Sequence, residues 1–483
     1  MKLDQLVAGA PSIEITGITA DSRKVKPGFL FAALQGVAKD GRDYIEGAIK
    51  SGAVAVLTDD RAGEWSVPAV KSADPRLTLA TAAAAFYPQQ PATVAAVTGT
   101  NGKSSTVDFL RQIWAHMGRK AASMGTLGAI GPSGSIDLGH TTPDPVMIHE
   151  TLAKLANEGV THAAMEASSH GLAQYRLHGV KLAAGAFTNL TQDHLDYHAN
   201  FDDYRLAKLK LFDDLLPAGS PAVLNADSPE LEAFETVARD GGLRVFTVGW
   251  RGRDLRIAEA LPRGTGQDLV IQWGEGPSAG NERKVHLPLI GEFQALNALC
   301  AAGIAMSLGD DVNKVLDGLA ALKGVHGRLE LVGQTAAKAP VFVDYAHTPD
   351  GLNVLLRAAR PHVRGKLIVV FGCGGDRDAT KRPIMGDVAR RLADEVIITD
   401  DNPRSEEPAA IRAAIRKGAP DASEIGDRAS AIMEGVRRLK AGDALLIAGK
   451  GHETGQIVKG VTIPFSDFDV ARSALTEVGG SHG

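Results

Sequence analysis

The sequence predicts an α/β protein built from three domains, and three observations lead to this fold class. At 483 residues the chain is longer than one hydrophobic core can organise. Short apolar, β-branched runs alternate along it with segments of helical length, which is the pattern of α/β units. Prolines near residue 90 and a polar stretch at 324–328 place the boundaries, giving domains 1–90, 91–326 and 327–483. We therefore expect a small N-terminal α/β domain, a larger central α/β domain and a C-terminal, Rossmann-like doubly wound domain.

The overall composition is that of an ordinary globular protein, with 44% hydrophobic and 23% charged residues. The net charge of −5 gives no basic field to attract nucleic acid or an anionic membrane, so small molecules are the expected partners. Cys300 and Cys373 are the only cysteines and lack metal-ligand spacing, which favours a reducing compartment over a zinc or disulfide framework. There is no signal-like N-terminus and no run of about 18 apolar residues. We expect a cytoplasmic monomer with no membrane insertion.

The N-terminal domain is predicted from short strand-like runs at 28–34, 54–57 and 67–70, which alternate with helical stretches. An alanine-rich helix at 77–86 closes the domain, and two prolines follow it as a linker near residue 91.

The central domain opens on a buried strand, a glycine turn and the start of a helix. In the turn, Gly99 and Gly102 precede Lys103 and Ser104. The backbone N–H groups of such a turn bind phosphate oxygens, a lysine there can reach the terminal phosphates, and the serine can hold Mg²⁺. The general phosphate-loop pattern places its first glycine five residues before the second, so this loop is two residues shorter. The sequence predicts ATP or GTP chemistry; the alternative is an ordinary turn with a solvated lysine.

Two later strands of the central domain, predicted at 161–165 and 183–187, each end in a polar cluster. Glu166 begins the first cluster, and the second contains His194. In a parallel sheet both clusters would lie beside the phosphate loop, where a carboxylate and a histidine can supply Mg²⁺ ligands. Taken singly, each histidine also fits a hydrogen-bonded interior or surface role. Residues 250–290, rich in arginine, glycine and alternating apolar positions, predict a β-rich insertion.

The C-terminal domain is predicted from four apolar strands, at 341–343, 367–371, 395–399 and 444–448, separated by helical lengths. Each strand is followed at once by polar or glycine-rich residues, at 344–347, 372–377, 400–404 and 449–453. Ligands of open α/β sheets bind at the carboxyl ends of the strands, so the pattern predicts a ligand site there.

Taken together, the motifs resemble those of the Mur ligase family over essentially the whole chain. The motifs that carry the resemblance are 99–104, 165–170, 188–190 with Asp193 and His194, 291–293 with Asn297, Gly327 and Arg328 with Glu330, and 344–347. The resemblance implies an ATP-dependent amide-bond ligase of peptidoglycan precursor synthesis, and thus a role in cell-wall biogenesis, cell shape and cell division. The sequences at 400–404 and 449–453 are similar to those of members that join meso-diaminopimelate to UDP-N-acetylmuramoyl-L-alanyl-D-glutamate. Addition of L-lysine, and a nucleotide hydrolase or switch, are the alternatives.

The resemblance also implies catalytic, ATP-binding and Mg²⁺-binding residues. Lys103 and the loop would hold the phosphates of ATP, while Ser104 with Glu166 would ligate one Mg²⁺ ion. His194 and Lys208 would hold a second, with Lys208 carbamylated to N6-carboxylysine; from its local sequence alone, Lys208 is a typical solvated lysine on an amphipathic helix. The full set for ATP is Gly99, Thr100, Asn101, Gly102, Lys103, Ser104, Ser105, Asn297, Arg328 and Asp344.

Substrate recognition is divided between the two ends of the chain. The resemblance implies that the UDP substrate binds Ser22, Thr141, Thr142, Ser168, Gln174 and Arg176. It implies that diaminopimelate binds Arg377, Asp401, Asn402, Pro403, Arg404, Gly449 and Glu453. A guanidinium suits the distal carboxylate of this amino acid, and a carboxylate suits its distal ammonium. The alternative interpretations are a polar turn at Ser22 and a helix-start arginine at Arg404. The sequence departs from the family at His326, usually proline, and Ala167, often valine.

Overall fold

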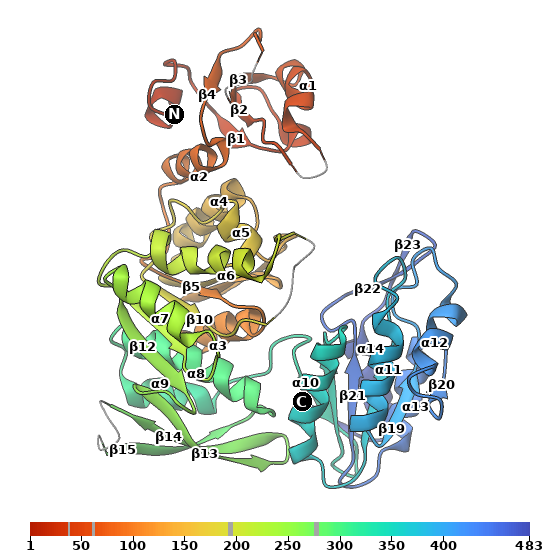
Figure 1. The fold of residues 1–483 in the computed structure, drawn as a ribbon. Helices are drawn as coiled ribbons and strands as arrows, with labels where there is room; N and C mark the ends of the chain where they lie inside the picture. The colour runs from red at the N-terminus through yellow and green to blue at the C-terminus, as the bar shows by residue number, and fades with distance from the viewer. Residues whose placement is uncertain (37–38, 60–62, 192–196, 275–279) are drawn as a thin grey trace. The chain divides into compact units, whose positions relative to one another are not determined.

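The computed structural model describes residues 1–36, 39–59, 63–191, 197–274 and 280–483. The chain forms two compact units (Figure 1). The first contains Met1–Leu255 and Leu299–Gly318, and the second contains Arg256–Gly274, the described part of Ser278–Ala298, and Leu319–Gly483. No helix among the described residues is both long enough and apolar enough to cross a membrane.

The first unit begins with a small sheet of parallel strands in the order β1-β2-β3-β4. Two apolar clusters pack on this sheet, one of them including Leu79 and Ala83 of the alanine-rich helix α2. Asp74 caps α2 by accepting hydrogen bonds from the backbone of Arg76 and Leu77, and Pro75 suits the first helical position. The elements are η1 (Leu3–Gln5), β1 (Gly17–Thr19), η2 (Ser22–Lys24), β2 (Phe29–Ala32), η3 (Gly41–Tyr44), α1 (Ile45–Lys50), β3 (Ala53–Thr58), β4 (Ala69–Lys71) and α2 (Pro75–Phe86).

The larger sheet of the first unit has the order β12-β11-β10-β5-β9-β6-β7-β8. Strands β10 and β9 flank β5 and run parallel to it, with Phe187 beside Thr98 and Glu166 beside Val97. The strands are β5 (Thr93–Thr98), β6 (Ala121–Gly125), β7 (Gly128–Gly131), β8 (Gly134–Ile136), β9 (His162–Glu166), β10 (Ala184–Phe187), β11 (Pro221–Asn225) and β12 (Arg244–Gly249). The helices are α3 (Lys103–His116), α4 (Pro145–Asn157), α5 (Ser169–Ala173), α6 (Phe201–Lys210), the π-helix η4 (Leu211–Leu215) and α7 (Leu231–Asp240).

The second unit contains a sheet in the order β20-β19-β18-β21-β17-β16-β24. Strands β20 to β17 of this order are parallel, whereas β16 pairs antiparallel with both of its neighbours, β17 and β24. Its strands are β16 (Glu330–Gln334), β17 (Pro340–Asp344), β18 (Leu367–Phe371), β19 (Glu395–Ile398), β20 (Ser423–Glu424), β21 (Ala444–Ala448) and β24 (Ser481–His482). The chain returns from β20 to place β21 between β18 and β17, so the strand order reverses there.

Alternate residues of these strands point to opposite faces, and each face has its own apolar cluster. Val369 and Leu446 pack with helices α10, α11 and α12, whereas Ile368 and Leu445 pack with α13 and α14. The sheet is therefore covered on both faces, as in a doubly wound fold. The helices are α10 (Pro349–Ala359), η5 (Arg360–His362), α11 (Lys381–Leu392), α12 (Pro408–Arg416), α13 (Arg428–Arg438) and α14 (Asp467–Glu477).

The remaining elements are a β-rich segment, two helices and a hairpin. Strands β13 (Leu255–Arg263), β14 (Gly266–Trp273) and β15 (Asn281–Leu287) confirm the predicted β-rich stretch. Helices α8 (Glu292–Ser307) and α9 (Val312–Ala320) contribute residues to both units. A two-stranded hairpin, β22 (Gly455–Val458) and β23 (Val461–Pro464), follows β21.

The predicted α/β class and the doubly wound C-terminal sheet are confirmed. Strands at 367–371 and 444–448 lie where they were predicted, because both are continuous apolar runs buried on two faces. The sequence did not predict the short strands β6, β7 and β8 or the antiparallel β16 and β24. These are glycine-rich, short or edge strands without a strong apolar signal.

Candidate active site

The glycine turn between β5 and α3 is held in one conformation by the end of β10. Backbone N–H groups of Thr100 and Asn101 donate to the carbonyl and side-chain oxygens of Asn189, at 2.8 and 2.9 Å, and Thr188 Oγ1 donates to Asn101 O at 2.6 Å. A Cβ on Gly99 would lie 2.0 Å from Thr188 Oγ1, so only glycine fits this approach. Lys103 begins α3 and its Nζ donates to Gly99 O and Thr100 O, both at 2.8 Å. Hydrogen bonds within the protein therefore hold the turn in its conformation.

Helix α6 places a buried tyrosine and a buried lysine beneath the same turn. Lys208 is 1% exposed, and its Nζ donates to Gly99 O at 2.8 Å and lies 4.5 Å from the centre of the Tyr204 ring. The hydroxyl of Tyr204 lies 3.0 Å from Thr100 Oγ1. The interpretation of Lys208 as a solvated lysine is therefore wrong. Tyr204, Ala207, Lys208 and Leu211 share one buried stripe at helical spacing, a sequence signal that could have identified both polar residues.

Glu166, at the end of β9, is a buried carboxylate beside the turn. It is 2% exposed, and its Oε1 accepts a hydrogen bond from the backbone of Thr126 at 2.8 Å. Gly125 ends the neighbouring strand β6, where a Cβ would lie 2.0 Å from Glu166 Oε1. The absence of a side chain at Gly125 therefore makes the space that this carboxylate occupies.

The residues predicted for the UDP substrate in the central part of the chain form one connected network. Thr142 Oγ1 donates to Glu166 O at 2.8 Å and accepts from the backbone of Ser168 at 3.0 Å. Arg176 donates to Thr142 O at 2.5 Å and to Gln174 Oε1 at 2.7 Å. Burial lowers the pKa of Arg176, although Asp144 opposes this shift. An anionic ligand would offset the cost of burying this guanidinium. Thr141 joins the network through Thr126, with 2.9 Å between their hydroxyl oxygens.

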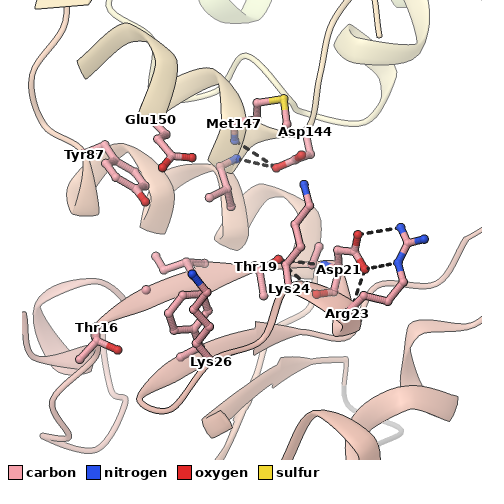
Figure 2. Close-up of a pocket in the computed structure, with 15 residues that line it drawn as sticks. Thr16, Thr19, Asp21, Arg23, Lys24, Lys26, Tyr87, Asp144, Met147 and Glu150 are labelled. Atoms are coloured by element: carbon pink, nitrogen blue, oxygen red, sulfur yellow. Dashed lines mark hydrogen bonds and ion pairs between the residues drawn. The ribbon is translucent and has the colours of Figure 1, made fainter. Parts of the chain in front are cut away.

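Two neighbouring cavities connect this network with the N-terminal strands. One, of about 200 Å³, is lined by Gln174 and Arg176, and another, of about 670 Å³, is lined by Asp21 and Arg23. Both share Ala20 and Asp144. Figure 2 shows the larger cavity, with Lys24 and Lys26 on the side of the N-terminal strands and Tyr87, Met147 and Glu150 on the opposite side. Ser22 stands between Asp21 and Arg23 at the start of η2 and is half-buried.

In the second unit, Asp344 ends β17 and holds two backbone segments together. Its carboxylate accepts from Leu329 N and Ala346 N, both at 2.7 Å, and burial raises its pKa despite the nearby Arg328. The Arg328 guanidinium lies 4.7 Å from the centre of the Tyr345 ring. Asn297 is connected to Arg328 through Gln294, which accepts from Asn297 Nδ2 at 3.2 Å and donates to Arg328 O at 3.0 Å. The three residues predicted to contact ATP in this unit thus belong to one region.

The polar residues after β18, β19 and β21 meet at one edge of the sheet, because Phe371 pairs with both Ile398 and Ala448. Arg404 has a left-handed backbone, with φ of 52°, and its guanidinium donates to Gly375 O at 2.8 Å. Its backbone N–H donates to Ile457 O of hairpin β22–β23 at 2.9 Å, and its carbonyl accepts from Lys459 N at 2.6 Å. Helix α12 begins only at Pro408, so the interpretation of Arg404 as a helix-start residue is wrong.

Asn402 and Glu453 are in direct contact beside Arg404. Asn402 Nδ2 donates to Glu453 Oε2 at 2.9 Å, and the buried Lys450 donates to both side chains. Asp401 lies so close to Gly449 that a Cβ there would approach its carboxylate to 2.6 Å. Pro403 is buried, whereas Arg377 is exposed.

Several residues that support these groups were not predicted as site residues. Asn189, Tyr204, Thr126 and Gly125 arrange the phosphate turn and Glu166, and Lys450 arranges Asn402 and Glu453. Asn189 and Lys450 lie within motifs already singled out in the sequence, and Tyr204 lies in the helical stripe, but the supporting roles of Thr126 and Gly125 are revealed only by their tertiary contacts. His194, predicted as a metal ligand, lies outside the described residues.

The donor set beside the turn fits Mg²⁺. Glu166 supplies a buried carboxylate and Ser104 a hydroxyl at the start of α3, and both are hard oxygen donors of the kind that Mg²⁺ prefers together with phosphate and water. Among the described residues there is no group of three or more His, Cys, Asp or Glu side chains that could hold a metal ion unaided. A Mg²⁺ ion here would complete its coordination with phosphate oxygens and water.

The fold, the short phosphate turn and the polar strand ends define one class of protein: the chain belongs to the Mur ligase family. Residues 14–97 match "Mur ligase family, catalytic domain", residues 97–305 the "Mur ligase middle domain", and residues 327–451 the "Mur ligase, glutamate ligase domain". Several relatives that match nearly the whole chain share one name. A protein of Caulobacter vibrioides, 53% identical over 96% of both chains, is named "UDP-N-acetylmuramoyl-L-alanyl-D-glutamate--2,6-diaminopimelate ligase".

Another relative and a solved structure carry the same name. The protein of Agrobacterium fabrum is 53% identical and covers 99% of this chain and 96% of its own. A solved structure of a UDP-N-acetylmuramoyl-L-alanyl-D-glutamate--2,6-diaminopimelate ligase matches with a TM-score of 0.74, 32% identity and 99% coverage of both chains. The family resemblance predicted from the motifs is confirmed.

Proposed function

We propose that this protein is the ATP-dependent ligase that joins meso-2,6-diaminopimelate to UDP-N-acetylmuramoyl-L-alanyl-D-glutamate in peptidoglycan precursor synthesis. The observation that carries the proposal is the edge of the second unit's sheet, where Arg404 lies beside the Asn402–Glu453 pair. The guanidinium suits a carboxylate and the Glu453 side chain suits an ammonium, which are the two groups at the distal end of diaminopimelate. L-Lysine lacks that carboxylate and offers no partner for Arg404.

The reaction must make a carboxylate electrophilic at neutral pH. The D-glutamyl side-chain carboxylate attacks the γ-phosphorus of ATP, giving an acyl phosphate and ADP. The uncharged α-amine of diaminopimelate then attacks the acyl carbon, and phosphate leaves as the amide forms. The phosphate turn and Lys103 stabilise the charge of the transferred group, and the braced geometry of the turn avoids reorganisation during transfer. Mg²⁺, when bound, would neutralise phosphate charge there.

The remaining assignments follow from this reaction. Ser104 and Glu166 would hold Mg²⁺, and Lys208, once carbamylated, would offer an anionic oxygen donor in place of its ammonium. Thr141, Thr142, Ser168, Gln174 and Arg176 would bind the nucleotide sugar along a path that continues to Ser22, in agreement with the two cavities that share Ala20 and Asp144. Asn297, Arg328 and Asp344 would contact ATP. The proposed domain limits are 1–90, 91–326 and 327–483.

We further propose that the protein acts as a monomer on small molecules in the cytoplasm. The two cysteines are buried free thiols, as expected in a reducing compartment.

One assay separates the proposal from its alternatives. The purified protein is incubated with ATP, Mg²⁺ and the UDP-muramoyl dipeptide, and phosphate release and product mass are measured with meso-diaminopimelate, with L-lysine and with neither. The proposal predicts coupled phosphate release and tripeptide formation with meso-diaminopimelate. Turnover with lysine in its place would identify a lysine ligase, and an equal rate of phosphate release with no amino acid added would identify a hydrolase.

A further inference from the structure

Lys450 carries a buried ammonium to which the proposed reaction gives no role. Its side chain is 0% exposed, and the residue lies two positions after the end of β21. Nζ donates to Asn402 Oδ1 at 3.0 Å and to Glu453 Oε2 at 2.9 Å. Burying an ammonium is costly unless it is paired and hydrogen-bonded, and here both partners belong to the proposed amino-acid site.

The first consequence is a single orientation for the Asn402 amide. Its Oδ1 accepts from Lys450 Nζ and from Ile457 N at 2.9 Å, while its Nδ2 donates to Glu453 Oε2. A flipped amide would turn its NH₂ group toward two donors and its oxygen toward a carboxylate, so the flip is excluded.

The second consequence is a fixed Glu453 carboxylate. Its Oε2 accepts from both Lys450 Nζ and Asn402 Nδ2, and its backbone N–H donates to Lys450 O at 3.0 Å. The Glu453 side chain is 34% exposed, so the carboxylate lies at the surface of the site while Lys450 lies beneath it. In the part of the chain that the structure describes, the Glu453 carboxylate accepts its side-chain hydrogen bonds at Oε2. Oε1 is therefore the oxygen oriented for a further donor.

We infer that Lys450 is a positioning residue for the amino-acid substrate, holding Asn402 and Glu453 so that Glu453 Oε1 receives the distal ammonium of diaminopimelate. This inference rests on the proposed function. Lys450 acts through its two partners and has no exposed surface of its own for the substrate.

The test compares ligands that differ only in the distal amine. For Lys450→Met, KM is measured for meso-diaminopimelate, ATP and the UDP-muramoyl dipeptide, together with Ki for 2-aminopimelate, which keeps the distal carboxylate but lacks the amine. KM for meso-diaminopimelate should rise about tenfold, because hydrogen bonds to charged groups contribute on that order. The other constants should change less than about twofold. Lys440→Met makes the same substitution at an exposed lysine of the same unit and should change none of them.

A purely structural role would raise KM for the three substrates and Ki for 2-aminopimelate together, and that result would overturn the inference. If Lys450→Met does not fold, Glu453→Gln is compared with Lys450→Met/Glu453→Gln, in which no unpaired carboxylate is left. KM for meso-diaminopimelate in the double variant should exceed that in Glu453→Gln by less than about twofold. A larger rise would contradict the inference that Lys450 acts through Glu453. Wild-type protein that ligates no meso-diaminopimelate would refute the proposed function and, with it, the inference.

Discussion

Substitution of Gly125 by alanine tests whether the position of Glu166 matters for the reaction. The added Cβ would lie 2.0 Å from Glu166 Oε1, and ordinary van der Waals contact begins at 3.4 Å, so the carboxylate or the end of β6 must move by about 1.4 Å. Glu166 is buried and bonded to Thr126 N at 2.8 Å, which leaves it little room for that movement. A misplacement of about 1 Å at a reacting centre can cost on the order of 10²-fold in rate.

The expected result for Gly125→Ala is a loss of kcat of about 10²-fold, with a higher half-saturating Mg²⁺ concentration. Overpacking costs about 1–3 kcal/mol of folding free energy. In a domain of about 150–250 residues that lowers Tm by roughly 2–12 °C, so the protein should remain folded at the assay temperature. Phosphate release is measured across a Mg²⁺ titration, with thermal melting in parallel.

The matched control is Gly47→Ala in α1, where a Cβ meets nothing within 4 Å. This substitution should leave activity unchanged and stabilise the helix by about 0.5–1 kcal/mol. A folded Gly125→Ala protein with wild-type kcat and wild-type Mg²⁺ dependence would refute the assignment of Glu166 to the metal.

Three further predictions concern other parts of the chain. Arg404→Ala should raise KM for meso-diaminopimelate at least about 30-fold, about 2 kcal/mol, because the substrate carboxylate loses its guanidinium partner; an equal rise for ATP would contradict this role. Lys208→Ala should abolish ligation, and carbon-13 NMR of active wild-type protein in labelled bicarbonate should show a carbamate, whose absence would exclude carbamylation. The hydrogen bond from His326 to Glu330 raises the pKa of His326 in the folded protein. This bond should therefore contribute fully to stability below the unfolded pKa of about 6.5, and the contribution should be lost as pH rises through the higher pKa of the folded state. The Tm difference between wild type and His326→Gln should therefore shrink from about pH 5.5 to about pH 8.5; a constant difference would contradict the linkage.

The sequence was sufficient to predict the order of the main elements and the edge of each sheet where polar residues gather. Parallel strands such as β18 and β21 are continuous apolar runs, and the residue after each strand lies at the carboxyl edge by geometry alone. The placement of Glu166 beside the phosphate turn followed from the same rule, because β9 pairs with β5.

The supporting contacts could not be predicted in this way. The helical stripe that contains Lys208 indicates a buried side chain, but its contact with Gly99, more than a hundred residues earlier in the chain, depends on how α6 packs beneath the turn. Gly125 acts through a close approach between two strand ends, and Lys450 acts through hydrogen bonds to two loop residues; both depend on three-dimensional packing. The left-handed backbone of Arg404 likewise depends on the hairpin that follows β21, more than fifty residues later.

That hairpin has a consequence for how the choice of amino acid could change. It holds position 404 by main-chain bonds to Ile457 and Lys459, and these bonds are available to any residue other than proline at this position. The side chain at 404 can therefore be exchanged while these two main-chain bonds are kept, although the bond from the guanidinium to Gly375 O is lost; glycine and asparagine are best suited to the left-handed backbone. The side chain that selects the amino acid is thus separate from the main-chain bonds that hold the loop. A single substitution at position 404 can therefore change which amino acid is selected while those bonds remain.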